Sequence, residues 1–363
     1  MTQRTQLVSQ VDTEIAEFLA SREPILAAIA GELAAFTNFS RYLLSGGKRF
    51  RARFCIAGWR SISTSLDPER ERAVVTLAAA LEVFHAAALV HDDIIDNSDT
   101  RRGMPAAHIR FADVHAQAGF AGSAHSFGRA SAILHGDLLL GWSDELVDSA
   151  LDLLADRQSA RSTRAEFNRM RTEVTAGQYL DILEENAWPT VSDSDTISRA
   201  QRVMTFKSAK YSVEAPLALG ALIGGGSATQ VDSLRRFGLP LGLAFQLRDD
   251  VLGVFGDAVV TGKPTGDDLR EGKRTVLVAF ARQGMDDAQR AAFDHSLGRT
   301  DLDEAAISDL QKQIESSGAL ESAERSISTY TAEALEALRL ARLEPAAASE
   351  LEQLARLLTD RSA

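Results

Sequence analysis

A short stretch of the sequence, Leu89 to Gly103 (LVHDDIIDNSDTRRG), places three carboxylates directly behind an apolar run. Like charges this close raise each other's pKa or require a cation between them. Asp92 and Asp96 are four residues apart, so on a helix they lie one turn apart on nearly the same face, with Asp93 at the side. Carboxylates without His or Cys partners suit Mg²⁺ better than zinc. The stretch predicts a Mg²⁺ site, and its alternative is a solvated acidic helix end.

A second apolar segment, FQLRDDVLGVFGD, also ends in paired aspartates, Asp249 and Asp250. Two such helix ends are expected to form opposite walls of one pocket. Because Mg²⁺ usually shares its ligands with substrate phosphates, a pocket of this kind would attract a diphosphate.

Basic residues follow or flank both acidic segments. They are Lys48, Arg49 and Arg51 after a glycine pair, Arg101 and Arg102 after the first cluster, and Lys207, Lys263 and Lys273 around the second. Arginine and lysine are the usual phosphate donors in proteins. Any one of them is more often a surface charge, so their repeated placement is the informative observation.

The elements that carry these residues are expected to be helices. Alanine and leucine are abundant, and only 6% of the residues are aromatic. Apolar residues recur at helical spacing over 71–96, 162–186, 231–257 and 306–341, and no run alternates β-branched residues. The sequence predicts one all-α domain over 1–363, a bundle of many helices with its motifs between about 37 and 343.

Composition excludes several classes of protein. A formal net charge of -12 argues against nucleic-acid binding, because phosphate contacts need basic faces. The single cysteine, Cys55, excludes an intrachain disulfide and fits a reducing compartment. No secretory signal is visible, and no apolar run approaches the roughly 20 residues needed to span a bilayer. We expect a cytoplasmic protein without a transmembrane segment.

Six motifs, in this order, resemble those of the trans-type polyprenyl diphosphate synthases, most closely the geranylgeranyl diphosphate synthases. They are GGKRFR, HDDIID with TRRG, GQYLD, FKSAKYS, FQLRDD and GKPTGDDLREGKR. The resemblance implies the isoprenoid synthase fold, with helices around a central cavity. It also implies a prenyltransferase of isoprenoid biosynthesis, which joins isopentenyl diphosphate head-to-tail onto an allylic diphosphate, and a homodimer.

The same resemblance assigns roles to individual residues. The Mg²⁺ ligands are Asp92, Asp96 and Asp249, supported by Asp93 and Asp250, with three ions per active site when substrate is bound. The allylic diphosphate contacts Arg101, Lys207 and Lys263, and isopentenyl diphosphate contacts Lys48, Arg51, His85 and Arg102. The positions that line the reacting centre are Gln178, Asp181, Ser208, Tyr211 and Gln246, and Lys273 lies on a closing flap. His85 without its motif would be interpreted as a core histidine.

One position departs from the family pattern. Many relatives have DDxxD as the second motif, whereas here the fifth residue is Gly253. A glycine side chain cannot bind a metal, so this ligand role is absent, and we expect activity to survive on Asp249 and Asp250.

The helix before the first aspartates is expected to line the growing prenyl chain. Counting back by helical turns from Asp92, the positions that face the tail are Ala88 and Ala87, then Phe84. The two alanines leave space where, in the family, aromatic residues stop growth at the farnesyl stage. Phe84 as the floor of the pocket favours a C20 product. If Phe84 only packs in the core, growth continues to C30 or beyond.

Three other functions are weighed against this one. A class I terpene cyclase shares the aspartate motif and the helices, but it does not need the isopentenyl diphosphate motif GGKRFR. A non-catalytic partner subunit would lose acidic motifs that are largely intact here. A phosphohydrolase built on His91 and Asp92 would need further histidine ligands, which the 7 histidines do not obviously provide.

Overall fold

The computed structural model describes residues 3–62, 67–101, 103–256, 265–299, 301–341 and 343–359. These residues form two compact units, and neither unit is a single continuous stretch of chain. Unit 1 comprises Met1–Arg164 and Leu219–Gly226, and unit 2 comprises Ala165–Ala218 and Ser227–Ala363. The single domain expected over 1–363 stays a prediction.

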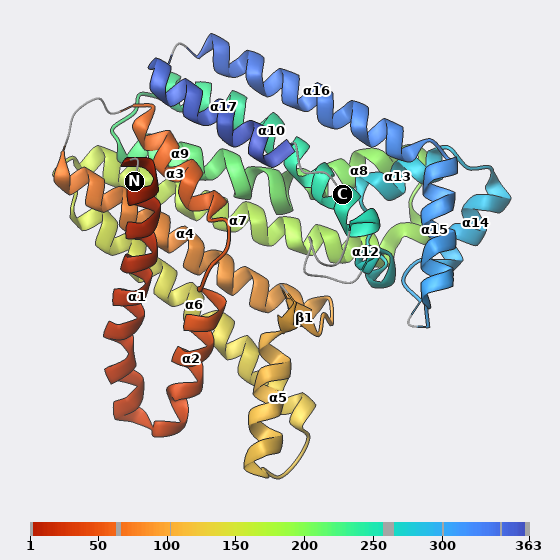
Figure 1. Cartoon of the computed structure of the whole chain (residues 1–363), viewed down its shortest axis with the longest axis horizontal. Helices are drawn as coiled ribbons and strands as arrows, with labels where there is room; N and C mark the ends of the chain where they lie inside the picture. Colours follow the sequence, from red (N-terminus) through yellow and green to blue (C-terminus); the bar gives the residue numbers. More distant parts are fainter. Residues whose placement is uncertain are drawn as a thin grey trace. The chain divides into compact units, whose positions relative to one another are not determined.

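The helices of unit 1 follow one another along the N-terminal part of the chain (Figure 1). They are α1 (Gln3–Ile29), the 3₁₀ turn η1 (Gly31–Leu33), α2 (Ala34–Leu43), α3 (Phe50–Arg60), α4 (Pro68–Ile95), α5 (Ala107–Ala118) and α6 (Ala124–Asp152). Strands β1 (Thr100–Arg101) and β2 (Met104–Pro105) form a short antiparallel pair between α4 and α5.

Two helices, α7 (Arg157–Ala187) and α9 (Ala215–Ile223), contribute residues to both units. The remaining elements belong to unit 2. They are η2 (Trp188–Thr190), η3 (Asp193–Asp195), α8 (Thr196–Val203), η4 (Met204–Glu214), α10 (Ala228–Phe255), α12 (Asp267–Glu271), α13 (Val276–Gln283), α14 (Asp287–Ser296), α15 (Glu304–Ser316), α16 (Ala319–Leu340) and α17 (Pro345–Thr359). The predicted all-α fold is confirmed, apart from the small β1–β2 pair.

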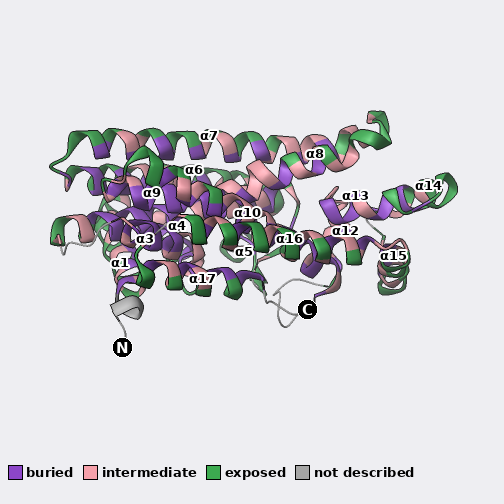
Figure 2. Cartoon of the chain, turned by 90° about the horizontal axis from the view of Figure 1, so that it is seen from above, coloured by how far each residue is buried: buried purple, intermediate pink, exposed green. Residues whose placement is uncertain are grey.

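Helix α4 is the central helix of unit 1. Its N-cap residue, Asp67, accepts a hydrogen bond from the backbone N–H of Glu69 at 3.1 Å, and Pro68 takes the first helical position, where no N–H is needed. From Ala73 to Ala87 every residue except His85 is buried (Figure 2). The helix therefore carries its acidic last turn out of an apolar core.

Helix α4 contains an 18-residue window apolar enough, and is itself long enough, to cross a membrane by length and composition. The expectation that no apolar run approaches this length is therefore wrong. In the folded chain, 83% of that window is buried inside the protein. Alanines and leucines of α4 pack against protein rather than lipid, which is how a core helix of a water-soluble domain behaves.

Part of α9 completes the packing around α3 in unit 1. A Cβ atom at Gly220 would lie 1.8 Å from the carbonyl oxygen of Cys55, so only glycine allows the two helices to approach this closely. The Cys55 thiol is free and fully buried, and burial raises its pKa.

Helix α10 organises the core of unit 2. It begins with a capping box, in which the Ser227 side chain and the Gln230 side chain each bond the other residue's backbone N–H. Pro240 lies inside the helix, which continues to Phe255. Helix α16 runs alongside α10 (Figure 1). Apolar residues of α10, α13, α15 and α16 share one buried cluster, which holds the acidic end of α10 in place.

Candidate active site

The carboxylates of the first acidic stretch lie at the end of α4. The backbone N–H of Asp96 donates to the carbonyl oxygen of Asp92 at 2.8 Å, so these residues are one helical turn apart, as the spacing predicted. Asp92 and Asp96 are half-buried, whereas Asp93 is only 1% exposed. Asn97, with φ 53, adopts a left-handed conformation that asparagine tolerates, and α4 ends before it.

Arg101, on strand β1, neutralises part of this negative charge. Its Nε donates to Asp93 Oδ1 at 2.7 Å, and its Nη2 donates to the same oxygen and to Asp92 Oδ2 at 3.4 Å. A fork of this kind fits carboxylate or phosphate oxygens equally well. The short β1–β2 pair thus brings one of the predicted diphosphate-binding residues against two of the predicted metal-site residues.

The predicted isopentenyl diphosphate residues also belong to unit 1. Lys48 is exposed in the loop before α3, and Arg51 is half-buried in the first turn of α3. His85 is half-buried on α4, between residues that are fully buried. Its role in binding isopentenyl diphosphate stays a prediction.

The three predicted chain-length residues lie along α4. Phe84 and Ala87 are buried, and Ala88 is partly buried. Leu81 and Leu77, the next residues on this face, are fully buried. The face of α4 before Asp92 is therefore apolar, and Phe84 is the first large side chain on it.

In unit 2 the predicted reacting-centre residues Lys207, Ser208 and Tyr211 lie on a π-helix, η4. Helices of this type are rare and frequently occur at functional sites. A Cβ atom at Gly177 of α7 would lie 2.3 Å from the backbone nitrogen of Lys207, and one at Gly242 of α10 would lie 2.5 Å from the carbonyl oxygen of Ala209. The two glycines thus let α7 and α10 approach the backbone of η4.

A buried charge cluster lies at the end of η4. Arg235 donates from Nη1 to Glu214 Oε1 at 3.1 Å and from Nη2 to Glu166 Oε2 at 2.7 Å. Burial raises the pKa of Glu214 to about 7. Two carboxylates therefore share one guanidinium in this cluster.

Two predicted lysines meet at one predicted carboxylate in unit 2. Lys207 Nζ forms an ion pair with Asp181 Oδ2, and Lys273 Nζ lies 3.8 Å from the same oxygen. Lys273 also pairs with Glu271 at 3.4 Å. Asp181 of α7 thus brings η4 and the segment after α12 to one point, with Gln178 half-buried one turn before it.

The two carboxylates of the second acidic pair differ in their exposure to solvent. Asp249 is exposed, whereas Asp250 is buried and accepts a hydrogen bond from Gln246 Nε2 at 2.8 Å. The pKa of Asp250 is raised well above its ordinary value, first by burial and then by the negative charges of Asp268, Asp249 and Asp181. The hydrogen bond from Gln246 acts in the opposite direction. Several carboxylates therefore converge on Asp250.

Asp268 is the residue of this group that sequence reasoning missed. A Cβ atom at Gly253, the position where the family pattern has an aspartate, would lie 2.1 Å from Asp268 Oδ2. The carboxylate of α12 thus occupies the space that a side chain at 253 would need. The sequence signal was the aspartate pair in TGDDLREGK, which entered the prediction only as part of a motif.

Among the described residues, no group of three or more His, Cys, Asp or Glu side chains is close enough to hold a metal ion by itself. The predicted ligands belong to both units, Asp92 and Asp96 to unit 1 and Asp249 to unit 2. Their chemistry nevertheless fits Mg²⁺, since all are carboxylates. The like-charge repulsion that raises the pKa of Asp250 is also what a bound cation relieves.

Two predicted phosphate-binding residues, Arg102 and Lys263, lie outside the described residues.

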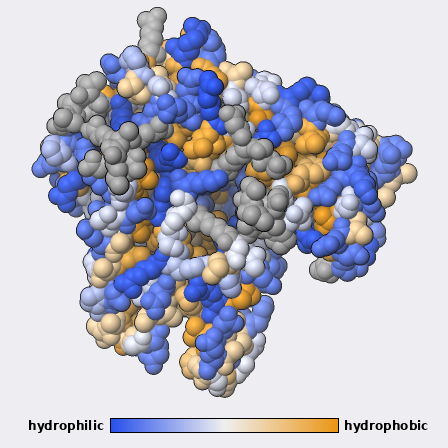
Figure 3. All heavy atoms as spheres, in the orientation of Figure 1, coloured by the Kyte–Doolittle hydropathy of each residue, from blue (hydrophilic) through white to orange (hydrophobic). Residues whose placement is uncertain are grey.

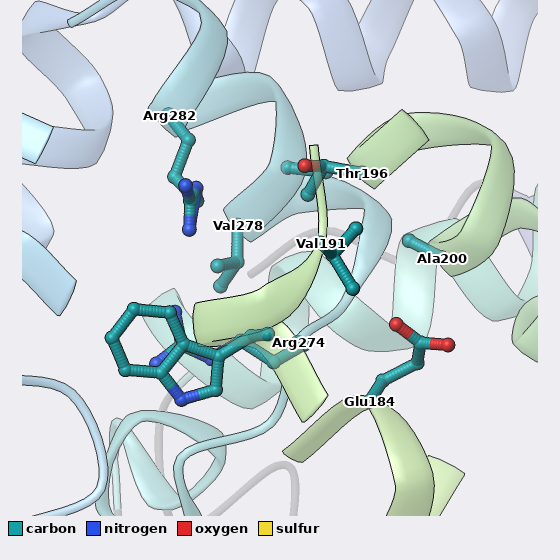
Figure 4. Close-up of a pocket in the computed structure, with 9 residues that line it drawn as sticks. Glu184, Val191, Thr196, Ala200, Arg274, Val278 and Arg282 are labelled. Carbon is teal, nitrogen blue, oxygen red and sulfur yellow. The ribbon is translucent and has the colours of Figure 1, made fainter. Parts of the chain in front are cut away.

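A small pocket in unit 2 lies among η2, α8 and α13 (Figure 4). Two of its lining residues are arginines, and both donate hydrogen bonds to one carboxylate. Arg274 Nη1 donates to Asp294 at 2.5 Å and Arg282 Nη1 donates to the same oxygen at 3.0 Å, while the Arg274 guanidinium also lies 4.1 Å from the centre of the Trp188 ring. The pocket is therefore part of a structural ion-pair network rather than an anion site.

Comparisons with known proteins agree with the motifs. The family model described as polyprenyl synthetase matches residues 34–314. A geranylgeranyl diphosphate synthase of Saccharolobus solfataricus is 32% identical over 85% of this chain and 81% of its own length. A geranylfarnesyl diphosphate synthase of Aeropyrum pernix is 30% identical over 87% of this chain and 89% of its own length. The crystal structure of a geranylgeranyl pyrophosphate synthase from Corynebacterium glutamicum, complexed with isoprenyl diphosphate and magnesium, superposes with a TM-score of 0.90 at 36% identity, covering 98% of this chain and 99% of that one.

Proposed function

We propose that this chain, which belongs to the polyprenyl synthetase family, is a trans-prenyltransferase that makes geranylgeranyl diphosphate (C20). It joins isopentenyl diphosphate head-to-tail to an allylic diphosphate. The observation that carries the proposal is the end of α4. There a long buried apolar helix terminates in carboxylates one turn apart, Asp92 and Asp96, with the Arg101 guanidinium beside them. An apolar wall next to a phosphate and metal site suits a substrate with a hydrocarbon tail and a diphosphate head.

The allylic diphosphate must be held while its carbon–oxygen bond breaks. Arg101 and Lys207 supply positive charge for its oxygens, and Lys263 is proposed for the same role. Mg²⁺ held by Asp92, Asp96 and Asp249, three ions with substrate bound, would stabilise the negative charge on the departing diphosphate. Because Lys207 Nζ pairs with Asp181, substrate oxygens would compete with this carboxylate for the lysine.

The allylic cation needs a dry site with few, well-placed dipoles. Ser208 and the backbone carbonyl of Lys207 on η4, with the Gln246 amide on α10, are the dipoles that we assign to this site. Buried Tyr211 excludes water on the same helix. The double bond of isopentenyl diphosphate then forms the new carbon–carbon bond, and the proton lost from its neighbouring carbon passes to the released diphosphate.

The product length follows from the α4 wall. Ala87 and Ala88 leave room beside the aspartates, and Phe84 closes the wall two turns before Asp92. A pre-formed apolar pocket limits the tail that it encloses. We infer a C20 product, and a C30 or longer product would require the pocket to continue past Phe84.

We further propose a cytoplasmic homodimer. Large apolar side chains are exposed in unit 1 at the turn between α5 and α6 and on α6 itself. They are Phe120, Phe127, Ile133 and Leu134. Phe127, Ile133 and Leu134 lie on α6, and Phe120 lies in the turn before it. Figure 3 shows hydrophobic residues that reach the surface among hydrophilic ones. Large exposed apolar residues in one region are typical of a protein–protein interface. Leu134→Glu should convert the dimer to a monomer in light scattering, and a wild-type protein that is already monomeric contradicts this proposal.

The activity is tested with purified protein, Mg²⁺ and isopentenyl diphosphate, each allylic starter from C5 to C15 being supplied separately. Products are sized by mass spectrometry. We expect a dominant C20 product, and Asp92→Ala should abolish turnover while Asp113→Ala, an exposed aspartate of α5, leaves it unchanged.

Each contrary result has a defined meaning. Longer chains would keep the enzyme class and place the floor deeper than Phe84. Failure to condense any starter would favour a class I terpene cyclase or a non-catalytic partner subunit. Undiminished turnover in Asp92→Ala would contradict the assignment of α4 as the metal-binding helix.

A further inference from the structure

The loop before α3 contains an arginine in an unfavourable backbone conformation. Arg49 has φ 51 and ψ 40, in the left-handed region that residues with a Cβ atom rarely adopt. Conformations of this kind persist only where the surrounding structure enforces them. The cause at Arg49 is visible in the contacts of its side chain.

Three groups hold the Arg49 guanidinium, and the residue as a whole is only 8% exposed. Its Nε donates to Asp12 Oδ1 at 2.9 Å, its Nη1 donates to Glu82 Oε2 at 3.3 Å, and its Nη2 donates to the carbonyl oxygen of Leu44. The guanidinium thus connects α1, α4 and the end of α2. Because these contacts fix the side chain inside unit 1, they also fix the backbone turn at residue 49.

The turn at Arg49 separates its neighbours. Lys48 is exposed, Arg49 is buried and Arg51 is half-buried. The Arg49 side chain is buried and points inward, whereas its neighbours Lys48 and Arg51 are more exposed, so Arg49 is not needed for phosphate contact itself. Its position indicates that it orders the segment that carries the other two.

The Glu82 carboxylate makes a second contact with this segment. Its Oε2 accepts the hydrogen bond from Arg49, and its Oε1 accepts one from the backbone N–H of Ala52 at 3.1 Å. Ala52 is the third residue of α3, and the N-cap side chain of α3 makes no capping hydrogen bond. The first N–H groups of a helix lack partners within the helix. Glu82 therefore caps α3 from another helix, and its negative charge suits the positive end of the helix dipole.

Glu82 also lies beside the third member of the predicted isopentenyl diphosphate site. It precedes His85 by three residues on α4, which places the two side chains on one face of the helix. One buried carboxylate thus connects the start of α3, which carries Arg51, with the part of α4 that carries His85.

We propose that Glu82 and Arg49 are positioning residues for isopentenyl diphosphate. They hold Lys48, Arg51 and His85 at the spacing that one diphosphate requires, and they do not touch the substrate. The proposal rests on the proposed function, because it needs those three residues to bind isopentenyl diphosphate. Because one diphosphate must contact several groups at once, a small shift of the α3 start should weaken the binding of isopentenyl diphosphate measurably.

The test separates the two substrates kinetically. In Glu82→Gln the amide nitrogen faces Arg49, so the hydrogen bond and ion pair between these two side chains are lost. The amide oxygen can still accept the hydrogen bond from the backbone N–H of Ala52. We expect KM for isopentenyl diphosphate to rise about tenfold or more, with KM for the allylic diphosphate and kcat within about twofold of wild type. Calorimetric titration with isopentenyl diphosphate alone should show the same loss of affinity.

A milder variant and a control complete the design. Arg49→Lys keeps the charge but loses the fork, so it should raise the same KM less than Arg49→Met does. Glu145 forms an exposed ion pair with Arg22, in which Oε2 and Nη1 are 2.7 Å apart. Glu145→Gln removes this pair and should leave both KM values unchanged.

The outcomes are distinguishable. If the Glu82 and Arg49 variants lower kcat and both affinities alike in parallel with their melting temperatures, the residues only stabilise the fold and the inference is wrong. Normal KM values in folded variants also overturn it. Absence of condensation by the wild-type protein instead refutes the proposed function, and the inference falls with it.

Discussion

Phe84→Ala should lengthen the prenyl product by one five-carbon unit. Leu81 lies three residues before Phe84, which is about 4.5 Å further from Asp92 along the axis of α4. This extra length is close to the span of one isoprene unit. Because Leu81 is fully buried, it becomes the new floor, and the dominant product should change from C20 to C25.

The stability cost of this substitution has to be separated from its effect on product length. Removal of a buried aromatic side chain costs about 3–5 kcal/mol, out of about 5–15 kcal/mol for a typical folded protein. Phe84→Leu therefore serves as a less destabilising variant. Phe167→Ala removes an equally buried phenylalanine from α7 in unit 2 and should lower the melting temperature without changing the product.

The assay sizes products by mass spectrometry at one temperature below every variant's melting point. Ala88→Phe places an aromatic ring one turn before Asp92 and should shorten the product. If Phe84→Ala and Ala88→Phe both fold and both give the wild-type products, α4 does not line the growing chain. That result would refute the floor assigned to Phe84.

Four further perturbations test other parts of the molecule. Gly253→Ala would place a Cβ atom 2.1 Å from Asp268 Oδ2, so the flexible carboxylate must move; we expect a higher Mg²⁺ requirement in turnover assays with little change in melting temperature. Gly220→Ala would bring a Cβ atom to 1.8 Å from a backbone carbonyl oxygen and should destabilise by about 1–3 kcal/mol in urea unfolding. Gly141→Ala has no atom within 4 Å and should stabilise by about 0.5–1 kcal/mol. Burial raises the pKa of Glu214 from 4.5 to about 7, so the folded chain keeps a proton that the unfolded chain releases. Stability should fall by up to about 3 kcal/mol as pH rises from about 4.5 to about 7, and Glu214→Gln should flatten this dependence in pH-resolved unfolding curves.

Local patterns were sufficient to predict the helices and the acidic end of α4. The apolar spacing from Glu71 to Asp96 predicted a helix that in fact begins three residues earlier, at Pro68. The four-residue spacing of Asp92 and Asp96 placed them one turn apart, because that relation depends on helix geometry alone.

Features that depend on tertiary packing were not predictable from these patterns. The π-helix η4 passes close to Gly177 and Gly242, which are distant in sequence from each other. Asp268 reaches position 253 through the placement of α12 against α10, which no spacing rule encodes. The role of Arg49 was likewise hidden, because a basic motif does not reveal which of its members points inward.

The interleaving of the two units has a consequence for how the chain is made. Leu219–Gly226 completes unit 1, yet it follows Arg164 by 55 residues, and Gly220 packs against Cys55 near the start of the chain. At about 5–20 residues per second, the ribosome needs about 3–11 s to supply this piece after the rest of unit 1. During that time α3 lacks its covering helix, and a truncated gene product that stops before Leu219 should leave the surface around Cys55 open to solvent.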